Sequence, residues 1–297
     1  MKIVVWGANG FIGAMLVKRL IDNGDSVVAV DFAFSNLDSF KQNPGIKLIN
    51  VNDIEAIDEV LSEKPALINL AAKRLTPDFS FDDYFQNIQI TMDILRKAAK
   101  FGITNVVTIS SIGVYSESQL PWRENETDRS MNLYGQSKRT IDSMIEHLNN
   151  FGFNIKSLRL AQVIGLHERK GFVLNTFIDQ AKNRNPLKIY GSGSGARQYI
   201  YIEDVISAIL VAVYSNNKGI YNIGLKGSVT ILQLAELINQ VFDNPSNIEY
   251  VPYDREDLNH YEMDVEKAYN ELRWTPEYSI EEALHEIKKK IEGVEYQ

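Results

Sequence analysis

Cysteine is absent from the 297-residue sequence. Its absence excludes disulfide bonds, thiolate metal sites and a cysteine nucleophile, and nothing marks the chain as secreted. The four histidines are scattered and have no carboxylates at metal-ligand spacing, so we expect no metal site. Basic residues are also in the minority: 31 Lys and Arg stand against 39 Asp and Glu, for a formal net charge of -8. We therefore expect no nucleic-acid partner, because such binding needs clustered basic residues.

Long apolar runs are missing as well. The longest one, Val205 to Tyr214, is about half of a membrane span and contains Ser207, which is typical of a packed helix. Met1 leads directly into strand-like residues and a glycine turn, without the apolar stretch and cleavage site of a signal peptide. These features predict a cytoplasmic protein with no membrane segment.

Short β-branched runs alternate with helix-period segments in the first half of the sequence, which is typical of repeated βαβ units. Many of these runs are wholly apolar, as expected for a parallel sheet covered by helices on both faces. We therefore expect an α/β fold with a Rossmann-type doubly wound parallel sheet. Strands are predicted at 2–6, 26–31, 46–50, 66–70, 105–110 and 154–160. Helices are predicted at 12–23, 54–61, 82–101 and 131–150.

The alternation becomes irregular after Gly165. A helix is predicted at 172–183, a glycine-rich turn at 191–195 and a terminal helix at 279–291. We expect a Rossmann domain at 1–165, to which 198–225 return. A smaller, interleaved substrate domain is expected to consist of 166–197 and 226–297.

A glycine-rich turn follows the first predicted strand and opens the first predicted helix. Its residues include Gly7, Asn9, Gly10, Phe11, Ile12 and Gly13. The glycines permit a tight turn and let backbone N–H groups approach a pyrophosphate at the positive end of the helix. A plain strand-to-helix turn is the alternative, but this position in a βαβ unit favours a dinucleotide site.

Asp31 ends the second predicted strand, where an acidic side chain can accept hydrogen bonds from the ribose hydroxyls of a dinucleotide. The same charge would repel a 2′-phosphate, and residues 32–40 contain no Lys or Arg to offset it. The sequence therefore predicts NAD rather than NADP. An Asp that merely begins a loop is the weaker alternative.

Tyr134 and Lys138 lie one helical turn apart on the same face of a predicted helix. Free tyrosine has a pKa of about 10, so a phenol that acts as a base near neutrality needs a shift of about 3 units. A nearby ammonium lowers the pKa in that direction. The spacing is common by chance, but Ser110 and Ser111 end another predicted strand, at the edge where ligands gather in open α/β sheets.

These motifs, in this order, resemble the extended short-chain dehydrogenase/reductases, also called the NAD-dependent epimerase/dehydratase family. The resemblance spans almost the whole chain. Besides the glycine turn and the Tyr134–Lys138 pair, it rests on residues 53–54, 69–72, 87 with 91, 110–115, 197–204 and 221–224.

The resemblance implies roles for particular residues. Ser111 takes the position of the catalytic hydroxyl, beside Tyr134 and Lys138. The cofactor residues implied, in addition to the glycine turn and Asp31, are Asp53, Ile54, Leu70, Ala71, Ala72 and Asn87. Arg197, Asn175 and Arg255 are implied to contact the substrate, although the acidic neighbours of Arg255 could pair with it instead.

Three departures from the family pattern are visible. Asn69 stands where the family more often has histidine, and Gln162 or Val163 stands near the position of a family asparagine. Ile112 and Gly113 replace the Asp-Glu pair that carries out water elimination in the family's dehydratases. The family's sugar decarboxylases usually keep a Glu at the second of these positions, so hydride chemistry alone is expected.

The resemblance thus implies an NAD-dependent nucleotide-sugar epimerase that acts at C4 through a transient keto sugar. The alternatives are an NAD(P)H-dependent 4-keto-sugar reductase and a non-catalytic nucleotide-binding regulator. We expect a homodimer through the two long helices, although their apolar residues could equally be monomer core: Ile88, Ile94, Leu95, Ile141, Met144 and Leu148. The charged run Glu168-Arg169-Lys170 is expected to be a solvated face.

Overall fold

The computed structural model describes residues 1–116, 119–126, 130, 132–166, 168, 171–245 and 247–293. The strands are β1 (Lys2–Trp6), β2 (Ser26–Asp31), β3 (Ile46–Asn50), β4 (Ala66–Asn69), β5 (Asn105–Ser111), β6 (Asn154–Leu160), β7 (Gln162–Ile164), β8 (Leu187–Tyr190), β9 (Ala196–Arg197), β10 (Tyr199–Tyr201), β11 (Gly219–Ile223), β12 (Val229–Thr230) and β13 (Ile248–Val251). The α-helices are α1 (Phe11–Asp22), α2 (Ile54–Leu61), α3 (Phe81–Phe101), α4 (Leu133–Asn150), α5 (Val173–Lys182), α6 (Ile202–Tyr214), α7 (Ile231–Val241) and α8 (Ile280–Glu292). Short helical turns lie at η1 (Ser35–Phe40), η2 (Ile112–Val114) and η3 (Ala268–Leu272).

Seven strands form a parallel sheet in the order β11-β6-β5-β4-β1-β2-β3. The strand order reverses between β1 and β4, so the chain leaves the sheet in opposite directions on either side of this junction. Open α/β sheets bind ligands at such a switch point, beyond the carboxyl ends of the strands.

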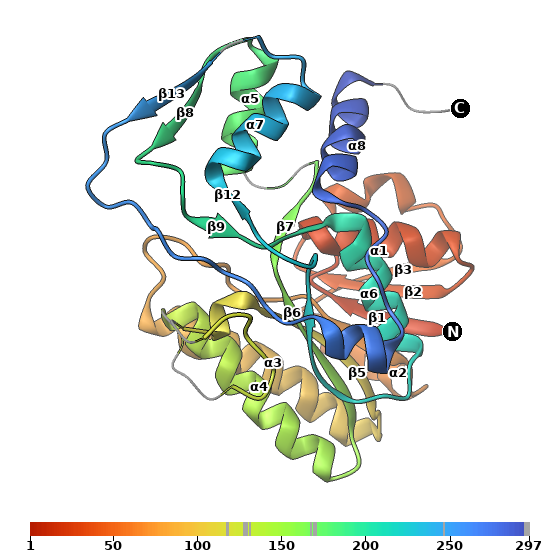
Figure 1. Cartoon of the computed structure of the whole chain (residues 1–297). Coiled ribbons are helices and arrows are strands. Elements are labelled where there is room, and N and C mark those ends of the chain that lie inside the picture. The colour runs from red at the N-terminus through yellow and green to blue at the C-terminus, as the bar shows by residue number, and fades with distance from the viewer. Residues whose placement is uncertain are drawn as a thin grey trace.

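Helices cover both faces of this sheet (Figure 1). Along β1, Ile3 and Val5 belong to a core shared with α1 and α6, whereas Val4 and Trp6 belong to a second core shared with α2, α3 and α4. This alternation follows from the twofold side-chain period of a strand. Because both faces are buried, apolar residues fill both sets of positions, as in the sequence.

The remaining elements form a smaller group beyond the carboxyl ends of the sheet strands. There β8 pairs with β13, β9 pairs with β12, and α7 packs against α5 and α8. In Figure 1 this group lies above the main sheet, and β7 passes from one part to the other. The chain returns to the main sheet through α6 and the edge strand β11.

The doubly wound fold predicted from the sequence is confirmed. The predicted strands agree with β1 to β6 to within one residue at each end, and the helices agree with α1, α2, α3, α5 and α8 to within one residue. α4 begins at Leu133, and Met131 in the prediction lies outside the described residues. Among the helices of the described part of the chain, none combines the length and apolar character needed to cross a membrane.

Candidate active site

The turn between β1 and α1 depends on glycine at two close approaches. Gly7 has φ +76°, and a Cβ there would lie 2.8 Å from the backbone nitrogen of Ala71 at the end of β4. A Cβ on Gly13 would lie 2.2 Å from the carbonyl oxygen of Gly7. The turn therefore packs tightly between β4 and α1, and the first N–H groups of α1 face outward beyond the sheet, where an anion can bind.

A cavity of about 1330 Å³ lies over this turn, between the sheet and the smaller group of elements. Its volume exceeds the range of about 300–1,000 Å³ typical of a single small-ligand pocket, which leaves room for two ligands. Most of the residues that the sequence singled out line it together: Gly7, Asn9, Gly10, Phe11, Ile12, Gly13, Asp31, Ile54, Leu70, Ala71, Ala72, Ser111, Tyr134, Lys138 and Arg197.

Asp31 lines the cavity at the end of β2 and is fixed by two backbone groups. Its Oδ2 accepts a hydrogen bond from the Asn9 N–H at 2.8 Å, and its Oδ1 accepts one from the Phe32 N–H at 2.7 Å. The carboxylate is thereby held beside the glycine turn, with lone pairs left for ribose hydroxyls. The glycine turn, the α1 N-terminus and Asp31 together fit an adenine dinucleotide without a 2′-phosphate.

Ser111 and Tyr134 both line the cavity and contact each other. Ser111 ends β5, and its Oγ accepts a hydrogen bond from the Gly113 N–H at 3.1 Å. Tyr134 lies in the first turn of α4 and is hydrogen-bonded to Ser111. Gly135 allows this meeting, because a Cβ there would lie only 1.7 Å from the carbonyl oxygen of Gly113.

The acidity of Tyr134 differs from the sequence prediction. Burial raises its pKa to about 12, and the hydrogen bond to Ser111 and the charge of Arg74 lower it only in part. Lys138 donates to the carbonyl oxygen of Ile109 at 2.9 Å, and its Nζ lies 5.9 Å from the centre of the Tyr134 ring. The expected lowering by Lys138 is therefore wrong for the protein alone, because burial dominates and the ammonium is directed at a backbone carbonyl.

Burial acts on Lys138 as well, and it lowers the pKa of this ammonium to about 8, against the opposing effect of Asp142. Desolvation disfavours the charged form of both side chains, which is why the phenol shifts upward and the ammonium downward. At neutral pH Lys138 thus remains mostly protonated and Tyr134 remains a phenol.

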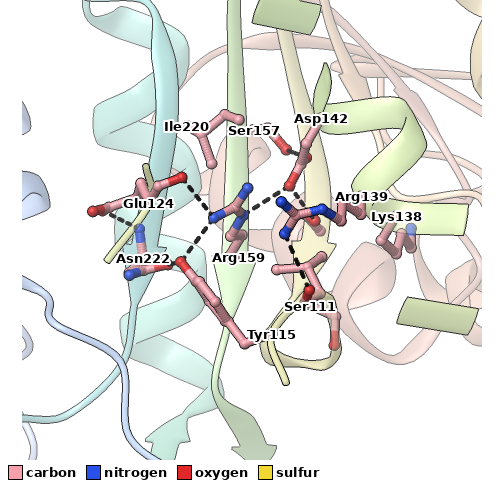
Figure 2. A network of polar contacts seen from close by, with 12 residues as sticks. Ser111, Tyr115, Glu124, Lys138, Arg139, Asp142, Ser157, Arg159, Ile220 and Asn222 are labelled. Atoms are coloured by element: carbon pink, nitrogen blue, oxygen red, sulfur yellow. Dashed lines mark hydrogen bonds and ion pairs between the residues drawn. The ribbon is translucent and has the colours of Figure 1, made fainter. Parts of the chain in front are cut away.

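A buried polar network lies behind these residues, as Figure 2 shows. Asp142, one turn beyond Lys138 on α4, accepts hydrogen bonds from Ser110 of β5 at 3.0 Å and from Ser157 of β6 at 2.6 Å. It also forms an ion pair with Arg159 of β6 at 2.8 Å, and both side chains are almost fully buried. The network ties α4 to the two strands that carry the site.

Four residues implied by the resemblance do not line the cavity. Asp53 caps α2, where its side chain accepts the Ala56 N–H at 3.1 Å. Asn87 is buried and holds the backbone of Lys73, accepting its N–H at 2.6 Å and donating to its carbonyl at 3.1 Å. Asn175 is hydrogen-bonded to Glu168, and Arg255 is exposed. Asn87 therefore acts on the cavity through the loop it holds.

Arg197 lines the cavity but is engaged within the protein. It pairs with Asp257 at 2.7 Å, lies 4.3 Å over the ring of Tyr261 and donates to the carbonyl of Asn259 at 3.0 Å. These contacts hold the segment 257–261 against the cavity wall. Arg197, for which the resemblance implied a substrate contact, thus already forms a salt bridge within the protein.

Glu168 was missed by the sequence analysis, which treated residues 168–170 as a solvated face. That interpretation is wrong for Glu168: it lines the cavity, and its Oε2 is buried with no hydrogen-bond partner within the described part of the chain. Burial raises its pKa to about 7, while the hydrogen bond from Asn175 opposes this shift. The charged run in the sequence did not indicate that Glu168 is buried, because its burial depends on residues distant in sequence. Residues 169 and 170 lie outside the described residues.

The possible metal ligands were compared across the described residues. Within the described ranges, no group of three or more His, Asp or Glu side chains is arranged to hold a metal ion.

Comparison with known proteins finds relatives of the family that the sequence motifs resemble. A family model described as "NAD dependent epimerase/dehydratase family" matches residues 3–224. UDP-glucuronic acid decarboxylase 1 of Arabidopsis thaliana is 27% identical over 96% of this chain, and the chain spans 68% of that protein. UDP-glucuronate 4-epimerase of Thermodesulfobacterium geofontis is 26% identical over 95% of this chain and 93% of its own length.

The solved structures that match this chain include enzymes of the same kind. UDP-glucose 4-epimerase from Thermotoga maritima, solved with UDP-glucose, matches 99% of this chain and all of its own with a TM-score of 0.85 and 26% identity. UDP-N-acetylglucosamine 4-epimerase from Methanobrevibacter ruminantium matches 99% of both chains with a TM-score of 0.87 and 25% identity. The resemblance stated from the sequence is confirmed.

Proposed function

The chain belongs to the NAD-dependent epimerase/dehydratase family, and we propose that it is a nucleotide-sugar 4-epimerase that works through a transient 4-keto sugar. The observation that carries this proposal is the hydrogen-bonded pair of Ser111 and Tyr134 in the wall of a cavity large enough for a dinucleotide and a nucleotide sugar. Relatives named as 4-epimerases support it.

NAD is the cofactor, and the residues present fit it. The glycine turn and the N-terminus of α1 suit its pyrophosphate, Asp31 suits the adenosine ribose, and Ala71 and Ala72 line the same cavity as Tyr134. Bound NAD⁺ supplies a reversible hydride acceptor close to the sugar. Its positive charge also favours the phenolate of Tyr134, in the direction opposite to burial.

The chain's own residues handle the proton and the reacting oxygen. Tyr134 removes the proton from the 4-hydroxyl when the sugar is oxidised and returns it when the keto group is reduced. Ser111 donates a hydrogen bond to the same oxygen and steadies the charge that develops on it. Lys138, held by the Ile109 carbonyl, keeps a positive charge beneath the phenol.

Gly113 supports epimerisation over elimination or decarboxylation. A Cβ at this position would lie 3.5 Å from the Ser111 Oγ and 3.9 Å from the Tyr134 Cδ1, both ordinary contact distances. A carboxylate-bearing side chain would therefore begin beside the reacting atoms. The glycine leaves no acid at this position, which disfavours a step that relies on a carboxylate beside Ser111 and Tyr134.

The net consumption of reduced cofactor distinguishes the epimerase from a 4-keto-sugar reductase. An epimerase returns the hydride to the same sugar, so protein with catalytic NAD⁺ should interconvert a UDP-hexose and its C4 epimer with no net change in reduced-nicotinamide absorbance. Stoichiometric oxidation of NADH or NADPH by a 4-keto-6-deoxy sugar, with no epimerisation of any intact sugar nucleotide, would make the protein a reductase.

We further infer the division of labour within the chain and its assembly. Residues 1–165 and 198–225 form the NAD-binding part, and 166–197 with 226–297 form the substrate-binding part, which the place of β11 in the main sheet supports. A homodimer through α3 and α4 is supported by Phe81 and Phe85, which are 64% and 58% exposed. Of the residues considered for this contact, Ile94, Leu95 and Ile141 are buried in the monomer core instead.

A further inference from the structure

Six cationic side chains line the large cavity, and five of them are already engaged. Lys73 faces Asp83, Arg96 faces Asp93, Lys97 faces Asp58, Arg197 faces Asp257, and Lys138 donates to a backbone carbonyl. Arg74 is the exception: within the described ranges it forms no hydrogen bond or ion pair. A guanidinium with five donors and no acceptor is therefore available to a ligand in this cavity.

Arg74 lines the cavity on the segment between β4 and α3, and this segment contacts the catalytic phenol: Phe79 packs edge-on against the ring of Tyr134, with 5.7 Å between ring centres. The same segment also borders an adjoining cavity of about 980 Å³. Its charge lowers the pKa of Tyr134, which places it within electrostatic reach of the phenol. The ligand group that it meets is therefore close to the atom whose proton Tyr134 transfers.

We propose that Arg74 binds a carboxylate on the sugar ring, so that the preferred substrate is a nucleotide-linked uronic acid. The inference rests on the proposed epimerase function, which puts the 4-hydroxyl next to Tyr134. The carboxylate of a uronic acid is attached to C5, directly beside C4, whereas the diphosphate is attached to C1 on the opposite side of the ring. A cation on the segment that packs against Tyr134 is therefore on the side of the ring that carries the carboxylate.

The chemistry of the two partners matches. A guanidinium presents parallel N–H donors that fit both oxygens of a carboxylate, and such charge-assisted pairs are stronger than neutral hydrogen bonds. The pyrophosphate of NAD has other partners in the glycine turn and the α1 N-terminus, so it does not require Arg74. A neutral hexose would leave the guanidinium with water in place of its carboxylate.

The test compares two substrates in four proteins. Initial rates of 4-epimerisation of UDP-glucuronate and UDP-glucose, with NAD⁺ present, give kcat/KM for the wild type, Arg74→Gln, Arg74→Lys and Lys73→Gln. The wild type should prefer the uronate by tenfold or more. Arg74→Gln should lose most of this preference through KM, Arg74→Lys should keep part of it, and Lys73→Gln, which removes the same charge from the adjacent residue, should keep the wild-type ratio.

Binding gives a readout independent of turnover. In NAD-loaded Tyr134→Phe protein, calorimetry should show tighter binding of UDP-glucuronate than of UDP-glucose, and adding Arg74→Gln should abolish the difference with NAD affinity unchanged. Equal use of both sugars by the wild type, equal losses for both in Arg74→Gln, or weaker NAD binding in that variant would overturn the inference. Uronate-selective binding that depends on Arg74, without epimerisation of either sugar, would instead overturn the proposed function and leave the carboxylate site standing.

Discussion

Tyr134 carries the proton transfer in the proposed reaction, and its surroundings keep it a phenol until the cofactor binds. Burial raises its pKa to about 12, while Ser111 and Arg74 provide smaller opposing effects. A phenol with this pKa is a poor base near neutrality, because almost none of it is ionised. The cationic ring of NAD⁺ is therefore part of what makes Tyr134 competent.

Replacing Tyr134 with Phe removes the proton-transfer group and leaves the ring. We expect turnover to fall by about 100-fold or more, the usual scale for losing a general acid/base. NAD binding, measured by fluorescence titration, should stay close to that of the wild type. Activity near the wild-type value would mean that Ser111 or a water molecule transfers the proton instead.

Glu168 makes stability depend on pH in a predictable direction. Its pKa rises from 4.5 to about 7 on folding, so the folded state keeps a proton that the unfolded state releases. The stabilisation that the protonated Glu168 side chain contributes is fully present below pH 4.5. It is lost as the pH rises through 7, because the carboxylate that then forms is buried. Glu168→Gln should therefore match the wild type near pH 4 and exceed it by about 1–2 kcal/mol at pH 8 in urea unfolding.

A pH-independent difference between the two proteins would show that Glu168 is ionised in the fold at all these pH values. The Gln side chain can still accept the hydrogen bond from Asn175, so loss of that contact is not a separate cause.

The places of the candidate site residues were predictable from the sequence where neighbours along the chain define them. The glycine turn, Asp31, Ser111 and Tyr134 each occupy a fixed place at the end of a strand or start of a helix, and the structure brings them together. The partners of Arg197 and Glu168 were not predictable, because Asp257 lies sixty positions from Arg197 and burial of Glu168 is tertiary.

At the scale of elements, α4 is fixed relative to β5 and β6 by a backbone contact and by buried polar contacts of Asp142. Gly135 allows the first turn of α4 to touch η2, and Asp142 ties the next turns to β5 and β6. Both contacts set the distance between Tyr134 and Ser111. The helix and the strands were predictable from periodicity, but this crossing was not, because it depends on contacts between elements.

Two glycines allow a matched test of this contact. Gly135→Ala puts a Cβ 1.7 Å from the Gly113 carbonyl oxygen, so α4 must shift, and we expect a loss of about 1–3 kcal/mol of stability together with a large loss of activity. Gly113→Ala meets its nearest atoms at 3.5 Å or more and should unfold at nearly the wild-type urea concentration. Equal stability of the two variants would show that α4 can move without cost.

At the scale of the whole molecule, the exposed aromatic side chains of α3 point to assembly. Phe81 and Phe85 lie 5.8 Å apart between ring centres and are both largely exposed. Exposed apolar patches of this kind often mark protein contacts. Core residues of α3 and α4 could not be separated from contact residues in the sequence, because both follow the same helical period.

Substituting both Phe81 and Phe85 with Ser should therefore weaken dimerisation by at least about tenfold, the scale of losing aromatic anchors at an interface. Sedimentation velocity over a range of concentrations measures it. Tyr253→Ser, which removes a 52% exposed aromatic from another part of the surface, should leave the association unchanged. A wild-type chain that sediments as a monomer at all concentrations would refute the assembly.

The edge strand β11 has a consequence for how the protein is made. β6 pairs with β5 on one side and with β11 on the other, and β11 is formed by Gly219–Ile223. During translation, residues 1–160 are synthesised before these residues, so the nascent sheet carries β6 with one edge unpaired for that interval. β11 is thus added to a sheet whose other strands have already been synthesised. If the chain were produced as two separate pieces cut at residue 165, this edge of β6 would stay unpaired in the first piece.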